Sequence, residues 1–154
     1  MAAITRPSVE SNSAYSGENL LCVTSSASSD KGKVSDVHAV CIPRIKGYFS
    51  GVGDIFSALV LAHYRPTDAT EALSQATSSA ICTIQGILLR THEYCDSLPE
   101  EEHPATDDEA DEADGERRVR RMRARELRIV QNIEYIRNPP RERHMARWTE
   151  FWGV

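Results

Sequence analysis

Four consecutive residues, Gly51 to Asp54, have the types and spacing that could bind and transfer a phosphate group. Two glycines that flank one residue let the backbone turn sharply and bring its amides close to a ligand without obstruction by a Cβ atom. A helix that begins at Gly53 or Asp54 adds unpaired N–H donors and the positive end of its dipole, which favours an anion. We therefore predict a phosphate site at this turn, formed by Gly51, Val52 and Gly53.

Asp54 has two interpretations at this position. A carboxylate beside a phosphate repels it, unless the carboxylate accepts the proton of an attacking hydroxyl, as a catalytic aspartate does in other phosphoryl transfers. Alternatively, Asp54 is the N-cap of the helix, a position that by itself favours aspartate. The spacing alone favours the cap.

The elements that must position this turn are two strands and two helices. Residues 20–24 and 37–42 are short apolar runs typical of buried strands, the first followed by serines and the second by Pro43. Apolar residues at helical spacing predict a helix over 54–63, directly after the glycines. A second helix is predicted over 68–90, where Asp68 and Glu71 have the spacing of a capping box. Its apolar face comprises Leu73, Ala76, Ala80, Ile81, Ile84, Ile87 and Leu88.

Composition limits the class of protein. The chain has 154 residues, of which 27% are charged and 40% hydrophobic, so we expect one α/β domain with some solvated sequence. A net charge of −5 argues against a general nucleic-acid binder. No apolar run approaches about 20 residues, and the first residues do not resemble a secretory signal, so we expect neither a membrane span nor secretion. The four cysteines are widely spaced among apolar neighbours, which favours reduced thiols and a cytoplasmic protein.

The remaining segments are polar or charged. Residues 1–19 lack periodicity and are predicted to be a tail or connector. Residues 96–116 are rich in Asp and Glu, which repel one another, and are predicted to be a disordered loop. Residues 117–133 combine an arginine run with recurring apolar positions and predict an amphipathic helix that ends before Pro139. The five histidines lack metal-ligand spacing, and no metal site is predicted.

Three ordered segments carry a resemblance to a known family. The run IPRIKGYFSGVGDIFSALVLAHY (42–64) resembles the signature of pyridoxal kinases, within the ribokinase-like superfamily. LLCVTSS (20–26) resembles a strand of the family that faces the nucleotide phosphates, and RARELRIVQNIEYIRNP (123–139) resembles its terminal helix. The resemblance implies the C-terminal part of a ribokinase-like three-layer α/β fold, with an incomplete sheet and at least three helices. Residues 20–95 would carry the nucleotide and phosphate site, and 117–154 the C-terminal helical segment.

The resemblance also implies an activity and residue roles. The activity would be ATP-dependent phosphorylation of the 5′-hydroxyl of pyridoxal, pyridoxine or pyridoxamine in vitamin B6 salvage, with Mg²⁺ or another divalent cation. Asp54 would be the general base, and residues 51–53 the anion hole over the transferring phosphate. The nucleotide would lie beside Thr24, Ser25, Ile45, Lys46 and Gly47. Val52 stands where the family often has threonine, so one hydroxyl contact is missing.

Other interpretations stay open. Pyridoxal kinases are about twice as long as this chain, so it would be a fragment or a truncated form. It could instead be an inactive remnant that binds nucleotide without turnover. Residues 117–128 could make it an arginine-rich interaction module, although the adjacent acidic segment would compete for the same arginines. An incomplete sheet exposes an edge, so self-association, for example as a homodimer, is also expected.

Overall fold

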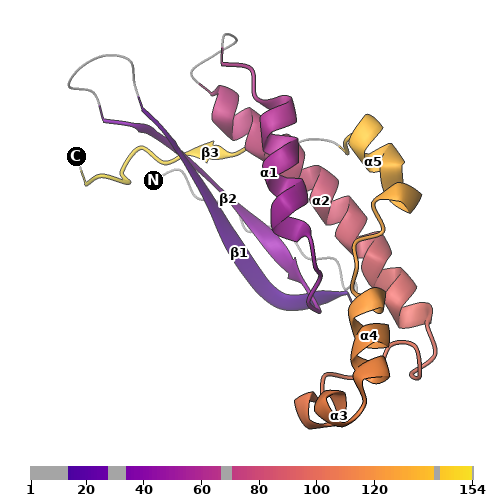
Figure 1. Cartoon of the computed structure of the whole chain (residues 1–154). Helices are drawn as coiled ribbons and strands as arrows, with labels where there is room; N and C mark the ends of the chain where they lie inside the picture. The colour runs from indigo at the N-terminus through magenta and orange to yellow at the C-terminus, as the bar shows by residue number, and fades with distance from the viewer. Residues whose placement is uncertain (1–13, 28–33, 67–70, 141–142, 154) are drawn as a thin grey trace.

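An antiparallel hairpin forms the centre of the sheet. The computed structural model describes residues 14–27, 34–66, 71–140 and 143–153. Strand β1 (Tyr15–Ser26) pairs along most of its length with β2 (Asp36–Ile45), and the short β3 (Ala146–Arg147) pairs with the other side of β2. The order β1-β2-β3 places β1 at one edge (Figure 1).

Both strands extend further than their apolar runs predict. Tyr15 pairs with Ile45, and the amide of Lys46 donates to the carbonyl of Ala14 at 2.8 Å, so part of the predicted tail at 1–19 belongs to the sheet. Pro43 does not end β2: it pairs with Asn19, and the pairing becomes irregular directly beyond this pair, between Asn19 and Tyr15. A proline, which lacks an N–H group, is tolerated at such an irregularity.

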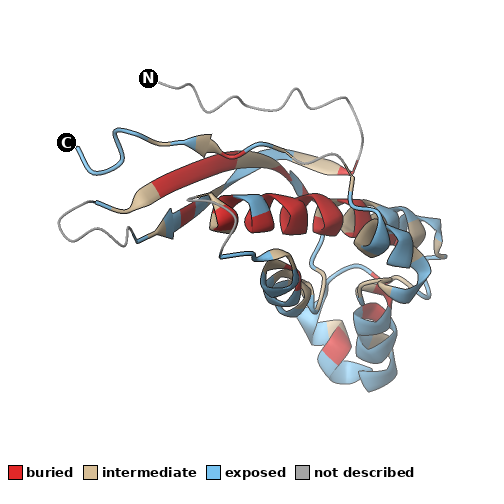
Figure 2. Cartoon of the chain, turned by 90° about the horizontal axis from the view of Figure 1, so that it is seen from above, coloured by how far each residue is buried: buried red, intermediate tan, exposed pale blue. Residues whose placement is uncertain are grey.

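Two helices cover one face of the sheet. Helix α1 (Val52–His63) packs against α2 (Ala72–Ser97), and α2 contacts both long strands (Figure 2). The predicted apolar face of α2 is confirmed at Ala76, Ala80, Ile81, Ile84 and Ile87, all of which are buried. Two clusters form the core between these layers, one around Val40, Ile81 and Met145 and the other around Leu59, Ala80 and Ile84.

The ends of α2 differ from the prediction. Asp68 lies outside the described residues, and Glu71 at the N-cap position makes no side-chain capping bond. The helix continues beyond Arg90 to Ser97. By length and composition α2 could cross a membrane, but 72% of its most apolar window is buried inside the molecule, as in the core helix of a globular domain.

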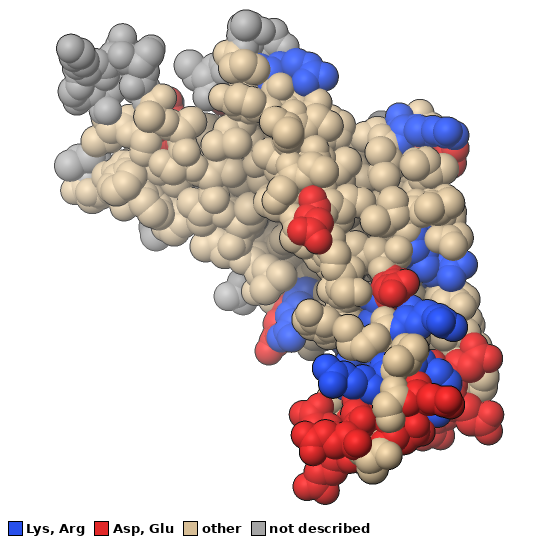
Figure 3. All heavy atoms as spheres, in the orientation of Figure 1, with Lys and Arg blue, Asp and Glu red and all other residues tan. Residues whose placement is uncertain are grey.

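The acidic segment contains a helix where the sequence predicts a disordered loop. Helix α3 (Asp108–Ala113) has Asp107 as its N-cap, and α4 (Gly115–Ala124) has Asp114, whose carboxylate accepts from the amides of Glu116 and Arg117. Figure 3 shows the acidic side chains gathered beside basic ones at this end of the molecule. Opposite charges and helix N-termini therefore offset the repulsion that the sequence suggests.

Asp111 lies at the centre of this arrangement. Its carboxylate is buried and forms ion pairs with Arg117 and Arg121. Carboxylates and guanidinium groups form strong charge-assisted hydrogen bonds. Two of the arginines are therefore already paired with a carboxylate of their own chain.

The arginine-rich helix is shorter than predicted. It stops at Ala124, and the chain then runs through a 3₁₀ turn, η1 (Val130–Asn132), into α5 (Ile133–Arg137). A separate helix, α5, is the one that ends before Pro139, at Arg137. The interruption lets residues 125 and 126 reach the segment that precedes α1, because Ser50 and Glu126 form an isolated parallel bridge.

Candidate phosphate-binding site

The glycine turn links the end of β2 to the start of α1. Gly51 has a left-handed backbone with φ of 83°, a conformation that a residue with a side chain rarely adopts. Gly51 is the N-cap of α1, and its carbonyl accepts from the amide of Ile55 at 3.1 Å. The structure thereby corrects one interpretation of Asp54, since this residue stands in the first helical turn and is not the cap.

The amides at the start of α1 are available to a ligand. Within the described part of the chain, the amides of Val52, Gly53 and Asp54 donate to no backbone carbonyl, and no side chain caps them. A Cβ atom built on Gly51 or Gly53 meets nothing within 4 Å, so the space above both glycines is open. Unpaired amides, open space and the positive end of a 12-residue helix together suit a phosphate group.

Asp54 lies at the mouth of this turn. Its side chain is exposed and forms no hydrogen bond or ion pair with another described residue. An unengaged carboxylate can accept a proton from a hydroxyl that approaches the turn. In a purely structural role, the same charge would stabilise the first turn of α1 through the helix dipole.

Packing on two sides holds the turn in place. On one side, the amide of Ser50 donates to the carbonyl of Arg125 at 3.1 Å. On the other, Val52, Ile55 and Phe56 pack against the cluster around Leu59. The turn is therefore fixed both by the core and by the segment that follows α4.

Three of the predicted nucleotide contacts lie close to the turn along the chain. Ile45 is buried at the end of β2, and Lys46 is held through its amide by Ala14. Gly47 has φ of 99°, and the ring of Phe49 lies 3.4 Å from where its Cβ would be. These residues begin the loop that leads directly into Gly51.

Thr24 and Ser25 lie at the opposite end of the hairpin. Thr24 pairs with His38, and Ser25 Oγ bonds to Ser35 Oγ at 2.8 Å. His38 lies about 23 Å along β2 from Ile45, the strand residue nearest to the glycine turn. The structure does not bring these two residues together with Asp54. Their nucleotide contact stays a prediction.

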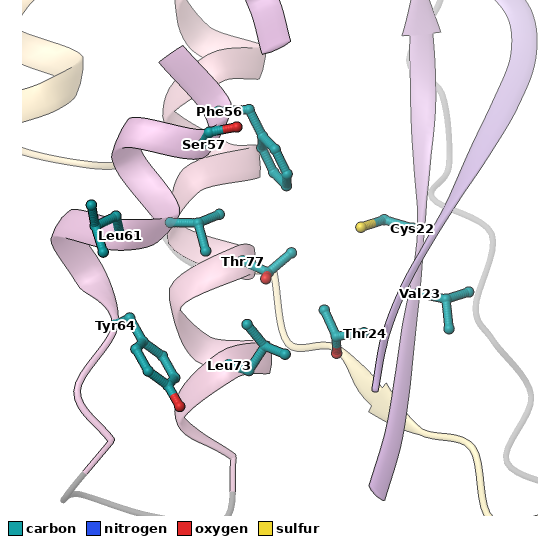
Figure 4. A pocket seen from close by; sticks show the side chains of 10 residues that line it. Cys22, Val23, Thr24, Phe56, Ser57, Leu61, Tyr64, Leu73 and Thr77 are labelled. Atoms are coloured by element: carbon teal, nitrogen blue, oxygen red, sulfur yellow. The ribbon is translucent and has the colours of Figure 1, made fainter. Parts of the chain in front are cut away.

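Thr24 instead borders an apolar groove that the sequence did not reveal. The groove has a volume of about 470 Å³ and lies between β1 and the two helices (Figure 4). Its walls are formed by Cys22, Val23, Thr24, Phe56, Ser57, Val60, Leu61, Tyr64, Leu73 and Thr77. Cys22 and Thr24 point toward the helices, and burial raises the pKa of the Cys22 thiol. Two apolar residues that stay exposed, Leu61 near the end of α1 and Tyr64 just after it, are the signal in the sequence that could have indicated this groove.

The described residues do not form a complete cation site. No group of three or more His, Cys, Asp or Glu side chains comes together in the ranges that the structure covers. Mg²⁺ takes oxygen ligands, of which the turn supplies one carboxylate. The amide donors fit a phosphate group, whereas a divalent cation would need ligands from elsewhere.

The described elements define a class of fold. A three-stranded antiparallel sheet with five α-helices is a mixed α/β architecture and corresponds to part of a ribokinase-like fold. The fold class predicted from the sequence is confirmed. One particular structural neighbour is the pyridoxal kinase of Trypanosoma brucei, which matches with a TM-score of 0.55 at 16% identity.

The match covers most of this chain but only a minor part of its structural neighbour. It covers 84% of this chain and 34% of that kinase, so the chain spans about a third of its neighbour's length. No family sequence model and no curated protein matches the chain. The likeness therefore concerns the fold.

Proposed function

We propose that this chain provides the phosphate-transfer turn of a ribokinase-like kinase that phosphorylates the 5′-hydroxyl of pyridoxal, pyridoxine or pyridoxamine. The observation that carries the proposal is the exposed Asp54 beside open amides at the start of α1. The structural likeness to a pyridoxal kinase supports the kinase class. The choice of B6 vitamer as acceptor rests on the sequence signature at 42–64.

Each residue of the turn has a distinct role in this proposal. The amides of Val52 and Gly53 hold the transferring phosphoryl group, and the helix dipole stabilises its negative charge. Asp54 accepts the proton that the acceptor hydroxyl loses as its oxygen attacks the γ-phosphorus of ATP, and the bond from that phosphorus to ADP breaks so that ADP leaves. Val52 contributes only its backbone, because its side chain cannot donate a hydrogen bond.

ATP is the proposed phosphate donor, and its triphosphate would lie over the turn beside Ile45, Lys46 and Gly47. Mg²⁺, when bound, would neutralise phosphate charge, using the triphosphate oxygens as ligands. Phosphoryl transfer depends mainly on positioning and charge neutralisation. A chain that matches a third of a kinase is therefore expected to bind nucleotide more readily than it turns substrate over.

The test combines ATP titration with detection of pyridoxal 5′-phosphate. The variants are Asp54→Asn and, as a matched control, Glu112→Gln, which removes an exposed carboxylate in the acidic segment. We expect saturable ATP binding by all three proteins and product formation that Asp54→Asn abolishes. Binding without any product would favour a nucleotide-binding remnant, and undiminished product from Asp54→Asn would exclude Asp54 as the base.

The interaction-module alternative receives less support from the contacts. Arg117 and Arg121 already pair with the buried Asp111, and Arg120 pairs with Asp114. These guanidinium groups would have to leave their partners before they could bind a nucleic acid or an acidic protein. No contact in the described residues favours that function over phosphate binding.

A further inference from the structure

The outer edge of β1 has no partner among the described strands. In the described part of the chain β1 pairs only with β2, so alternate amides and carbonyls along its other edge have no strand partner. Residues 19–26 contain neither proline nor a charged side chain, the features by which proteins usually block an exposed edge. Leu20 and Leu21 are each 50% exposed, and Val23 is 41% exposed.

The groove beneath this edge is apolar and open. Its strand wall is formed by residues 22–24, and its helix wall includes Val60 and Leu61, of which Leu61 is 76% exposed. A strand added beside β1 would extend the sheet over α1 and cover this groove. The geometry therefore suits an occupant that supplies a strand with uncharged side chains on the helix side.

We propose that the occupant is the β1 strand of a second copy, paired antiparallel about Cys22. A twofold axis perpendicular to the sheet places the helix-facing side chains of both copies on the same side. Directly opposed residues in an antiparallel pair point to the same face of the sheet. The helix-facing side chains of the two copies therefore share a face only when the twofold axis passes through a residue, not between two residues.

The pairing centred on Cys22 matches the side chains best. It sets Leu21 opposite the partner's Val23 on one face, and Leu20 opposite the partner's Thr24 on the helix face. Shifting the centre to Leu21 would instead set Val23 against Asn19 and Thr24 against the charged Glu18.

Charge is also compatible with this arrangement. Glu18 is the only charged residue of β1, and it forms an ion pair with Arg44 of its own chain. In the Cys22-centred pairing it lies opposite the partner's Ser26. Like charges do not oppose one another along the shared edge, so electrostatic repulsion does not prevent pairing.

The arrangement leaves the glycine turn free. Gly51 follows the end of β2 that pairs with Tyr15, whereas the pairing is centred near the middle of β1. The turns of the two copies therefore lie toward opposite ends of the shared sheet. This proposal does not depend on the kinase activity.

Crosslinking through Cys22 tests the register. The variants are Cys22→Ser and, as a matched control, Cys41→Ser on the neighbouring strand, whose thiol is also half-buried. Molecular oxygen with a copper catalyst removes two electrons and two protons from paired thiols, and the reaction is run at alkaline pH because burial raises the pKa of Cys22. We expect a disulfide-linked dimer from the wild type and from Cys41→Ser, and none from Cys22→Ser.

Sedimentation tests the interface without a crosslinking reaction. Val23→Lys places a charge on the edge and is expected to give a monomer, whereas Val130→Lys, at an exposed position of η1, leaves the dimer intact. Circular dichroism confirms that both variants are folded. A wild-type monomer at all concentrations, an open series of larger species, or crosslinking through Cys41 would overturn the proposal, as would dimerisation unaffected by Val23→Lys.

Discussion

The amide of Ser50 donates a hydrogen bond to the carbonyl of Arg125, 75 residues further along the chain, at 3.1 Å. This contact fastens the residue before the glycine turn to the segment that follows α4. The position of the proposed phosphate site therefore depends on a part of the chain that carries no proposed chemistry.

Removing the Ser50 amide tests this dependence. Ser50→Pro deletes the donor, whereas Ser50→Ala keeps it and serves as the control. We expect Ser50→Pro to lower the free energy of unfolding by roughly 1–3 kcal/mol and to weaken ATP binding, with Ser50→Ala near wild type. Denaturant unfolding and calorimetric titration measure the two effects. Equal behaviour of the two variants would show that the hydrogen bond does not hold the turn.

The two glycines of the turn are expected to respond differently to alanine. Gly53 has open space and an ordinary helical backbone, so Gly53→Ala should stabilise the protein by about 0.4–1 kcal/mol. Gly51 has a positive φ, and Gly51→Ala should destabilise it by about 1–2 kcal/mol. Both methyl groups project beside the proposed phosphate position, so both should weaken ATP binding. A more stable Gly53→Ala protein with unchanged ATP affinity would argue against the site.

Gly86 provides the opposite case, a helical glycine that packing requires. A Cβ at this position would lie 2.3 Å from Cδ1 of Tyr135, so α5 could not keep its present contact with α2. Although alanine favours a helix, we expect Gly86→Ala to destabilise the fold by about 1–3 kcal/mol. Gly86→Ala combined with Tyr135→Ala should recover part of that loss. Thermal unfolding of the two variants measures the difference.

Asp111 is expected to be the most sensitive position of the acidic segment. Asp111→Asn leaves Arg117 and Arg121 without their shared charge partner, and the loss of a buried ion pair typically costs about 3–5 kcal/mol. Amide hydrogen exchange should show loss of protection across α3 and α4. Asp108→Asn, at a carboxylate that is 90% exposed, is the control and should change little. Unchanged protection in Asp111→Asn would contradict the ion-pair account of this segment.

We expect the free energy of unfolding to fall at alkaline pH, because the thiol of Cys95 loses its proton there. Its thiol is buried, and burial together with the nearby Asp96 raises its pKa above the ordinary value of 9.0. The folded state therefore holds the proton more tightly than the unfolded state. This contribution is fully present below the unfolded thiol pKa and is lost as pH rises through the folded pKa. Comparing Cys95→Ala with the wild type across this range isolates the effect, and parallel pH profiles would contradict it.

The turn itself could be predicted because its determinants are local. Glycine spacing, an aspartate and apolar residues at helical intervals are sufficient to place the start of α1. The role of Gly51 as N-cap was missed, since its left-handed backbone depends on how the loop from β2 is held.

The places of Thr24 and Ser25 could not be predicted from local signals. They lie at the end of β1, and in a hairpin the end of the first strand lies where the second strand begins, far from the turn that follows β2. The helical structure of α3 was also not predicted. It depends on pairing between Asp111 and arginines later in the chain, and such contacts leave no periodic pattern.

The central claim is that the amides of the Gly51–Asp54 turn bind the phosphate of ATP, and amide chemical shifts measured by NMR during an ATP titration test it most directly. We predict that the largest shifts occur at Val52, Gly53 and Asp54 and that Gly53→Ala diminishes them. Shifts confined to other parts of the molecule, with these amides unchanged at saturating ATP, would contradict the claim.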